Sequence, residues 1–236
     1  MPNAQKSRNL LYACGIPYQR SERLFVRLRN NLTDLGITYR RIPVNSIGKD
    51  VYCDTRVFLD AIQSIFADKA LPTCLADNAY EALGYRTFWI SLPLIPASLI
   101  TPGTLGDRED LFSVFGRPDC VDLRPNSLAE FKSVLDMLEN ECLVLGQCIN
   151  GPECSVADFH TIWIVKWAFQ TVEICSEPGF SRDDFPTVYM WIEGLPTHNE
   201  QNDTKKISPE EAQEKLLNSD YAAAEISVDP RDATGL

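Results

Sequence analysis

The hydrophobic and polar positions of this chain change their pattern part of the way along it. Up to about residue 70, short apolar stretches bounded by Gly, Pro and Asp alternate with stretches in which apolar residues recur every three or four positions. The first pattern is typical of strands and the second of helices. Beyond that point only the helical spacing continues. The pattern therefore predicts a small α/β unit followed by an all-α unit.

The first unit is expected to contain helices around a hairpin. Residues 4–14 predict a helix that ends at Gly15, and the GIPYQR that follows has the pattern of a short strand. Residues 21–35 are basic and weakly periodic, which indicates an irregular or partly helical connection. From Val44, a strand to Ile47, a turn at Gly48-Lys49 and a second strand through Val51 and Cys53 predict a hairpin. Asp54-Thr55 then caps a helix with an apolar face formed by Val57, Phe58, Ala61, Ile62, Ile65 and Phe66.

Three helix patterns follow in the second unit. One is expected to begin at Ser127, with Glu130 three residues later, and another at Ser155, with Asp158 three residues later. Both pairs have the spacing of a capping box, in which the two side chains hydrogen-bond the first turn reciprocally. The third helix is expected within DDFPTVYMWIEGL.

The last segment, from Thr197, is polar and carries nine Asp and Glu against four Lys and Arg. It predicts a mostly mobile acidic tail with one short helix at Ser208-Pro209, since proline at a first helical position commonly follows a serine cap. The chain is thus divided into residues 1–70, 71–196 and 197–236.

Composition and charge narrow the classes of partner. A formal net charge of −11 would repel a phosphate backbone, so no nucleic acid partner is expected. The longest nearly apolar run, Phe88 to Ile100, is shorter than the roughly 20 residues that a membrane helix needs, and two prolines interrupt it. The amino terminus has no apolar signal-peptide core, so the expected location is cytoplasmic, and the eight cysteines are expected to be reduced.

The spacing of Cys142, Cys148, Cys154 and His160 offers a metal-site interpretation, which we disfavour. Zinc ligands usually come as close pairs that a single turn aims at one point, and the chain has no CxxC. Free cysteine is commonly a small buried hydrophobe. A histidine on the surface or in the core of a helix is the simpler interpretation of His160. No metal is therefore expected.

Three segments together resemble the glutathione transferases. RIPV, the hairpin VNSIGKDVYC and the DT that opens a helix are similar to the cis-proline, antiparallel strands and acid-hydroxyl pair of the family's thioredoxin-like domain. GPECSVADFHTIW resembles the central helix of its helical domain, and FPTVYMWIEGL its closing helix. The resemblance covers about residues 2 to 195. It implies an incomplete thioredoxin-like domain followed by an all-helical domain, in a little-characterised branch of the family.

The resemblance also implies a glutathione site. Pro43 corresponds to the cis-proline, and Ile42 would pair its main chain with the cysteinyl part of glutathione. The γ-glutamyl carboxylate would bind Thr55 and the amides of the helix start, and Asp54 would take the ammonium group. Without the resemblance, Asp54 and Thr55 would be interpreted as a plain helix cap.

The chain departs from the family where the catalytic residue is expected. The family's first strand and the loop after it carry the Ser, Cys or Tyr that holds the glutathione sulfur as a thiolate. Met1 aligns with the end of that loop, so the catalytic residue of this chain is unknown. Ser7 lies inside the first helix and is interpreted as a solvated residue rather than a replacement. The basic SERLFVRLRNN also departs from the family pattern at the glycyl end of glutathione.

The function implied is that of a glutathione transferase-like protein that conjugates or reduces small apolar electrophiles with glutathione as co-substrate, a role in detoxification. The resemblance also allows a homodimer. The alternative is a non-catalytic binding or interaction protein that keeps the scaffold without the chemistry.

Overall fold

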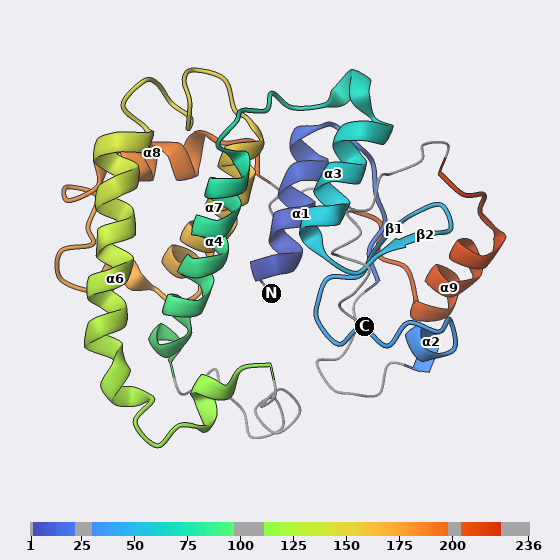
Figure 1. Ribbon diagram of the computed structural model, residues 1–236, viewed down its shortest axis with the longest axis horizontal. Helices are drawn as coiled ribbons and strands as arrows, with labels where there is room; N and C mark the ends of the chain where they lie inside the picture. Colours follow the sequence, from blue (N-terminus) through green and yellow to red (C-terminus); the bar gives the residue numbers. More distant parts are fainter. Residues whose placement is uncertain (1, 22–29, 97–110, 198–203, 223–236) are drawn as a thin grey trace.

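The computed structural model describes residues 2–21, 30–96, 111–197 and 204–222 (Figure 1). The helices of these segments are α1 (Pro2–Ala13), α2 (Asn30–Thr33), α3 (Thr55–Ile65), α4 (Asp77–Ser91), α6 (Arg124–Met137), α7 (Val156–Gln170), α8 (Pro186–Gly194) and α9 (Pro209–Asn218). The strands are β1 (Asn45–Ile47) and β2 (Asp50–Tyr52). Short 3₁₀ turns lie at Ala67–Lys69, Leu92–Leu94, Ser113–Gly116, Val121–Leu123 and Ile174–Ser176, and a π-helical turn at Leu138–Cys142.

The first unit packs α1 and α3 beside each other, with the hairpin next to them (Figure 1). β1 and β2 are antiparallel, and their register places Asn45 opposite Tyr52 and Ile47 opposite Asp50, as the predicted turn requires. The apolar faces of α1 and α3 form a core that includes Leu10, Phe58 and Ile62. Phe159 of α7 completes this core, so the helical unit is joined to the first unit by shared apolar burial.

The expected strand at GIPYQR does not form in the described residues. Arg20 instead makes a single parallel bridge to Lys206, far along the chain. A strand exists only where a neighbour supplies hydrogen bonds along its length, and local sequence does not specify that neighbour.

The second unit is built around α7, which is buried along nearly its whole length. Its capping box is confirmed: the Ser155 side chain accepts from the backbone of Asp158, and Asp158 accepts from the backbone of Ser155. α8 lies where the sequence predicts it and buries Val188, Trp191 and Ile192.

Two helices of the second unit differ from expectation. α6 begins at Arg124 with Pro125 in its first turn, so the predicted start at Ser127 is wrong. A proline at the first turn starts a helix as readily as a serine cap does, and Ser127 is instead buried. No separate pattern predicts α4, because three of its four buried positions, Gly84, Thr87 and Ser91, are small or polar, and only Phe88 is a large apolar residue.

The described part of the acidic tail lies against the first unit. α9 begins at Pro209, and the Ser208 side chain accepts from Glu211 N, as the predicted serine cap requires. Residues 204–222 make backbone hydrogen bonds with Arg20 and with the hairpin turn. α9 lies beside α2 (Figure 1).

Among the described residues, no helix is both long and apolar enough to cross a membrane. All eight cysteines are free thiols.

Candidate functional site

The hairpin brings the predicted site residues to one of its ends. Pro43 lies just before β1 and Asp54 just after β2, and the pairing of Asn45 with Tyr52 places these two flanks opposite each other. The Ile42-Pro43 peptide bond is cis, as the sequence predicts. Ile42, Pro43 and Thr55 are half-buried, whereas Asp54 is exposed.

The start of α3 has the geometry of a helix cap. Asp54 is extended (φ −129°, ψ 146°), and its Oδ1 accepts a hydrogen bond of 2.7 Å from Arg56 N. One carboxylate oxygen of Asp54 thus accepts a hydrogen bond from one of the backbone N–H groups of the first turn, which have no partner within the helix. The helix start also carries a partial positive charge, which favours an anion close to Thr55.

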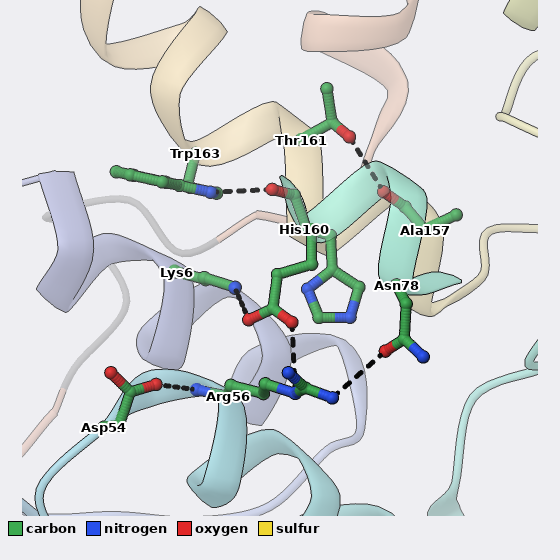
Figure 2. A network of polar contacts seen from close by, with 9 residues as sticks. Lys6, Asp54, Arg56, Asn78, Ala157, His160, Thr161 and Trp163 are labelled. Atoms are coloured by element: carbon green, nitrogen blue, oxygen red, sulfur yellow. Dashed lines mark hydrogen bonds and ion pairs between the residues drawn. The ribbon is translucent and has the colours of Figure 1, made fainter. Parts of the chain in front are cut away.

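A partly buried ion cluster joins the two units beside this helix start (Figure 2). Lys6 of α1 lies 3.5 Å from Glu81 Oε1, and Arg56 Nε of α3 lies 3.3 Å from Glu81 Oε2. The Lys6 side chain is only 4% exposed. Burial lowers the pKa of Lys6, and Glu81, Asp54 and Asp60 oppose that shift. Burial raises the pKa of Glu81, against the effect of Lys6 and Arg56.

His160 of α7 lies next to the cluster, with its ring close to Arg56 and Asn78 in Figure 2. The side chain is buried, and its Nδ1 has no hydrogen-bond partner among the residues that the structure describes. Burial, followed by Lys6 and Arg56, lowers the pKa of His160 to about 3, so the imidazole is neutral at pH 7. His160, Arg56, Asn78 and Glu81 line one side of an open cavity of about 360 Å³ between α3, α4 and α7.

Tyr39 lies close to Asp54, and Tyr85 lies close to Tyr39. Burial and then Asp54 raise the pKa of Tyr39 to about 12, with smaller effects from Arg41, Cys53 and Tyr85. The Tyr39 phenol therefore keeps its proton at neutral pH and can donate a hydrogen bond. Tyr85 is half exposed on α4 and forms an edge-to-face pair with Trp89, at 5.9 Å between ring centroids. An aromatic surface of the helical unit thus begins next to the predicted site.

Neither Ser7 nor Cys14 is available as a nucleophile. Ser7 is 2% exposed, and its Oγ accepts a hydrogen bond of 3.3 Å from Asn45 Nδ2, so its interpretation as a solvated residue is wrong. Burial raises the pKa of Cys14 to about 11, which leaves it as a thiol at neutral pH.

The cysteine spacing does not build a metal-type cluster. Within the described ranges, no three His, Cys, Asp or Glu side chains are placed to hold a metal ion. Burial raises the pKa of Cys148 to about 12, and that of Cys142 and Cys154 also rises, mainly through burial. These thiols pack in or against the apolar cores of the two units.

The arrangement of the two units matches a solved structure. A GST-like protein from Pseudomonas syringae superposes with a TM-score of 0.62 and 21% sequence identity, over 98% of this chain and 76% of that one. The chain has a glutathione transferase-like fold. Its thioredoxin-like part is represented here by α1, the hairpin and α3, and its helical part by α4 to α8.

Three other comparisons give less information about the fold. Glutathione S-transferase from Legionella pneumophila superposes with a TM-score of 0.46 and 16% identity, over 82% of this chain and 89% of that one. Residues 91–203 match a family model described as a domain of unknown function (DUF7962). No curated protein matches the chain.

Sequence reasoning missed the ion cluster and Tyr39. Lys6 lies in a helix of low amphipathicity and Glu81 in a helix that was not foreseen, so no local pattern pairs them. One signal was available in the sequence: Lys6 lies on the same helical face as Leu10, so it is expected to be buried if Leu10 is. A buried charge requires a partner, which would have indicated an ion pair at Lys6.

Proposed function

We propose that this chain is a glutathione transferase-like protein that binds glutathione at the start of α3. The observation that carries the proposal is the position of Asp54 and Thr55, which open a capped helix at the same end of the hairpin as Pro43. The helix start offers amides to a carboxylate, and Asp54 offers a carboxylate to an ammonium group. The γ-glutamyl end of glutathione carries both of these charged groups.

The helical unit supplies a surface for an apolar second substrate. Tyr85 and Trp89 are partly exposed, and Phe112 continues the aromatic group at 6.1 Å from Trp89. Because Tyr39 lies near both Asp54 and Tyr85, the proposed substrate site would border the proposed glutathione site. The reaction would be attack of the glutathione sulfur on a small electrophile, or reduction of that molecule, with the protein holding both partners in place.

Binding and turnover depend on different groups in this site. Asp54 and Thr55 would contact the charged end of glutathione and leave its thiol pKa unchanged. Activation of the sulfur needs a donor or cation that favours the thiolate. Tyr39, with its raised pKa, is a weak stabiliser of an adjacent anion, and the pKa of Cys53 is also raised, mainly by burial. We therefore expect weak binding and slow turnover.

The test is calorimetry with glutathione alongside a conjugation assay with a reactive aryl halide. Asp54→Ala and Thr55→Ala should each weaken binding by roughly ten-fold, as expected for the loss of a hydrogen bond to a charged group. Asp68→Ala removes an exposed carboxylate from the Ala67–Lys69 turn and is the matched control. Conjugation by the unmodified chain should stay near the uncatalysed rate.

Two results would contradict the proposal. If the unmodified chain and the Asp54 and Thr55 variants bind glutathione equally well, the binding site does not lie at the start of α3. Rapid conjugation by the unmodified chain would show that a group other than those described activates the thiol.

A further inference from the structure

The segment 204–222 contacts the first unit at two separate places. Near its beginning, Lys205 O accepts a hydrogen bond of 3.1 Å from Arg20 N, and Ile207 N donates one of 2.9 Å to Arg20 O. These two bonds form a parallel bridge of the kind found between neighbouring strands. We call residues 204–222 the arm.

The second contact lies at the hairpin turn. Lys49 N donates a hydrogen bond of 3.0 Å to Asp220 O, and Ala222 N donates one of 2.9 Å to Asp50 Oδ2. Gly48 permits this approach, because a Cβ atom there would lie 2.1 Å from Asp220 O. The Lys49 ammonium lies 5.8 Å from the centre of the Tyr221 ring.

Apolar burial contributes little to this docking. No side chain between residues 204 and 222 is fully buried, and α9 has no buried residue. Leu217 is 53% exposed and Tyr221 is 74% exposed. Hydrogen bonds made on docking replace hydrogen bonds to water, so they stabilise a contact much less than buried apolar surface does. The arm should therefore detach at a small free-energy cost compared with unfolding of the core.

We propose that the edge formed by Arg20 and the Gly48–Asp50 turn is a binding surface for an extended peptide, and that the arm of a second copy of this chain fits it. Docking by main-chain bonds is strand addition, in which shape and backbone pairing supply most of the recognition. In this structure the chain's own arm occupies the surface. When the arm detaches, the bonds that Arg20 and Lys49 make to it are broken, and an incoming strand would form the same bonds.

Backbone and steric fit favour the arm as occupant. The edge pairs with Lys205 O, Ile207 N and Asp220 O of the arm, and Gly48 leaves room for the Asp220 carbonyl oxygen, so a second copy of the same segment meets a matching surface. The chain's own arm has the advantage of a high effective concentration, so an added arm competes well only when the internal one is loosened.

The experiment uses the full chain and a fluorescein-labelled peptide with the sequence of residues 204–222. Ile207→Pro removes the N–H that bonds to Arg20 O, whereas the matched Ile207→Ala retains it. In fluorescence anisotropy titrations, the peptide should bind the Ile207→Pro chain at least ten-fold more tightly than the unmodified and Ile207→Ala chains. A peptide that itself carries Ile207→Pro should bind all three chains poorly.

Hydrogen exchange of the unmodified chain provides a test without any variant. The amides of Ile207 and Ala222 should exchange through a local opening, far faster than those of the buried helix α7. Exchange of these arm amides only upon global unfolding would overturn the proposal, because the arm would then be a fixed part of the core. Equal peptide binding by the Ile207→Pro and Ile207→Ala chains, or unchanged exchange at Arg20 in the Ile207→Pro chain, would also overturn it.

Discussion

His160 shows how burial sets the charge state of a single residue. It lies on α7, the most buried of the described helices, next to Lys6 and Arg56, and its Nδ1 has no hydrogen-bond partner within the described segments. Each of these features disfavours the imidazolium. The histidine is therefore a neutral group that fills the junction between α3, α4 and α7, and its protonation would introduce an uncompensated charge there.

Acid should destabilise the fold through His160. Its folded pKa of about 3 is below the ordinary histidine pKa of 6.5, so the unfolded state binds the proton more readily between these values. This contribution to stability is present above the unfolded pKa and is lost as the pH falls toward the folded pKa, at about 1.4 kcal/mol per pH unit. Urea unfolding measures the free energy of unfolding at pH 6.5 and at pH 4.5. Between these two pH values the unmodified chain should lose about 2–3 kcal/mol more of this free energy than the His160→Gln chain does.

The comparison with His160→Gln is necessary because Glu81 shifts in the opposite direction. Burial raises its pKa, so acid relieves a cost at Glu81 while it imposes one at His160. Since both chains contain Glu81, the difference between them isolates the histidine. The same pH dependence in both chains would mean that His160 is solvated in the folded state.

At the scale of elements, the closest approach of α4 and α7 depends on Gly84. A Cβ atom on this residue would lie 2.1 Å from the carbonyl oxygen of His160, well inside van der Waals contact. The neighbour is backbone in the middle of a buried helix, so it cannot move aside cheaply. Thr87 and Ser91 continue the same buried face, and their hydroxyls donate to Leu83 O and Thr87 O within α4. Small residues thus allow the two helices to pack closely.

Gly84→Ala should lower the free energy of unfolding by about 1–3 kcal/mol or more, because the added methyl group overpacks this contact. Gly194→Ala is the matched control, since a Cβ atom at that position in α8 meets nothing within 4 Å. Alanine is the better helix former, so this control should be neutral or slightly stabilising. Thermal and urea unfolding measure the stability change caused by each substitution. Equal effects of the two substitutions would place the helices further apart than described.

At the scale of the whole molecule, Glu81 links the units. It is a residue of α4 that pairs with Lys6 of α1 and Arg56 of α3, and Phe159 of α7 adds apolar contact with the first core. Cooperative unfolding of the two units should depend on this junction, because each unit alone buries less apolar surface than the pair does.

Glu81→Gln should destabilise the chain by about 3–5 kcal/mol, since it leaves Lys6 buried without its carboxylate. Lys6→Met should lower the free energy of unfolding by less than Glu81→Gln does, because it removes the buried charge and keeps an apolar stem of similar length. All four tryptophans lie in the helical unit, so fluorescence reports that unit and far-ultraviolet circular dichroism reports both. The two unfolding curves should coincide for the unmodified chain and separate for Glu81→Gln. A larger loss for Lys6→Met would contradict the assignment of Glu81 as the linking residue.

Local patterns in the sequence determined the elements whose signals lie within a few residues. The hairpin, the Asp54 cap, the Ser155–Asp158 capping box and the helix at Ser208-Pro209 all follow from turn and cap chemistry, which acts between near neighbours in the chain. The site residues Ile42, Pro43, Asp54 and Thr55 follow from the family resemblance, and they flank that hairpin. Their binding of glutathione stays a prediction.

Tertiary structure alone decided the features that join distant segments. The pairing of Arg20 with the arm, the Lys6–Glu81–Arg56 cluster and the contact of Gly84 with His160 each connect residues that no local pattern relates. The same is true of Ser7, which is buried by its contact with Asn45 in spite of a polar surrounding sequence. Burial and charge pairing depend on which surfaces meet in the folded chain, and hydrophobic spacing along one element specifies only the face that it will bury.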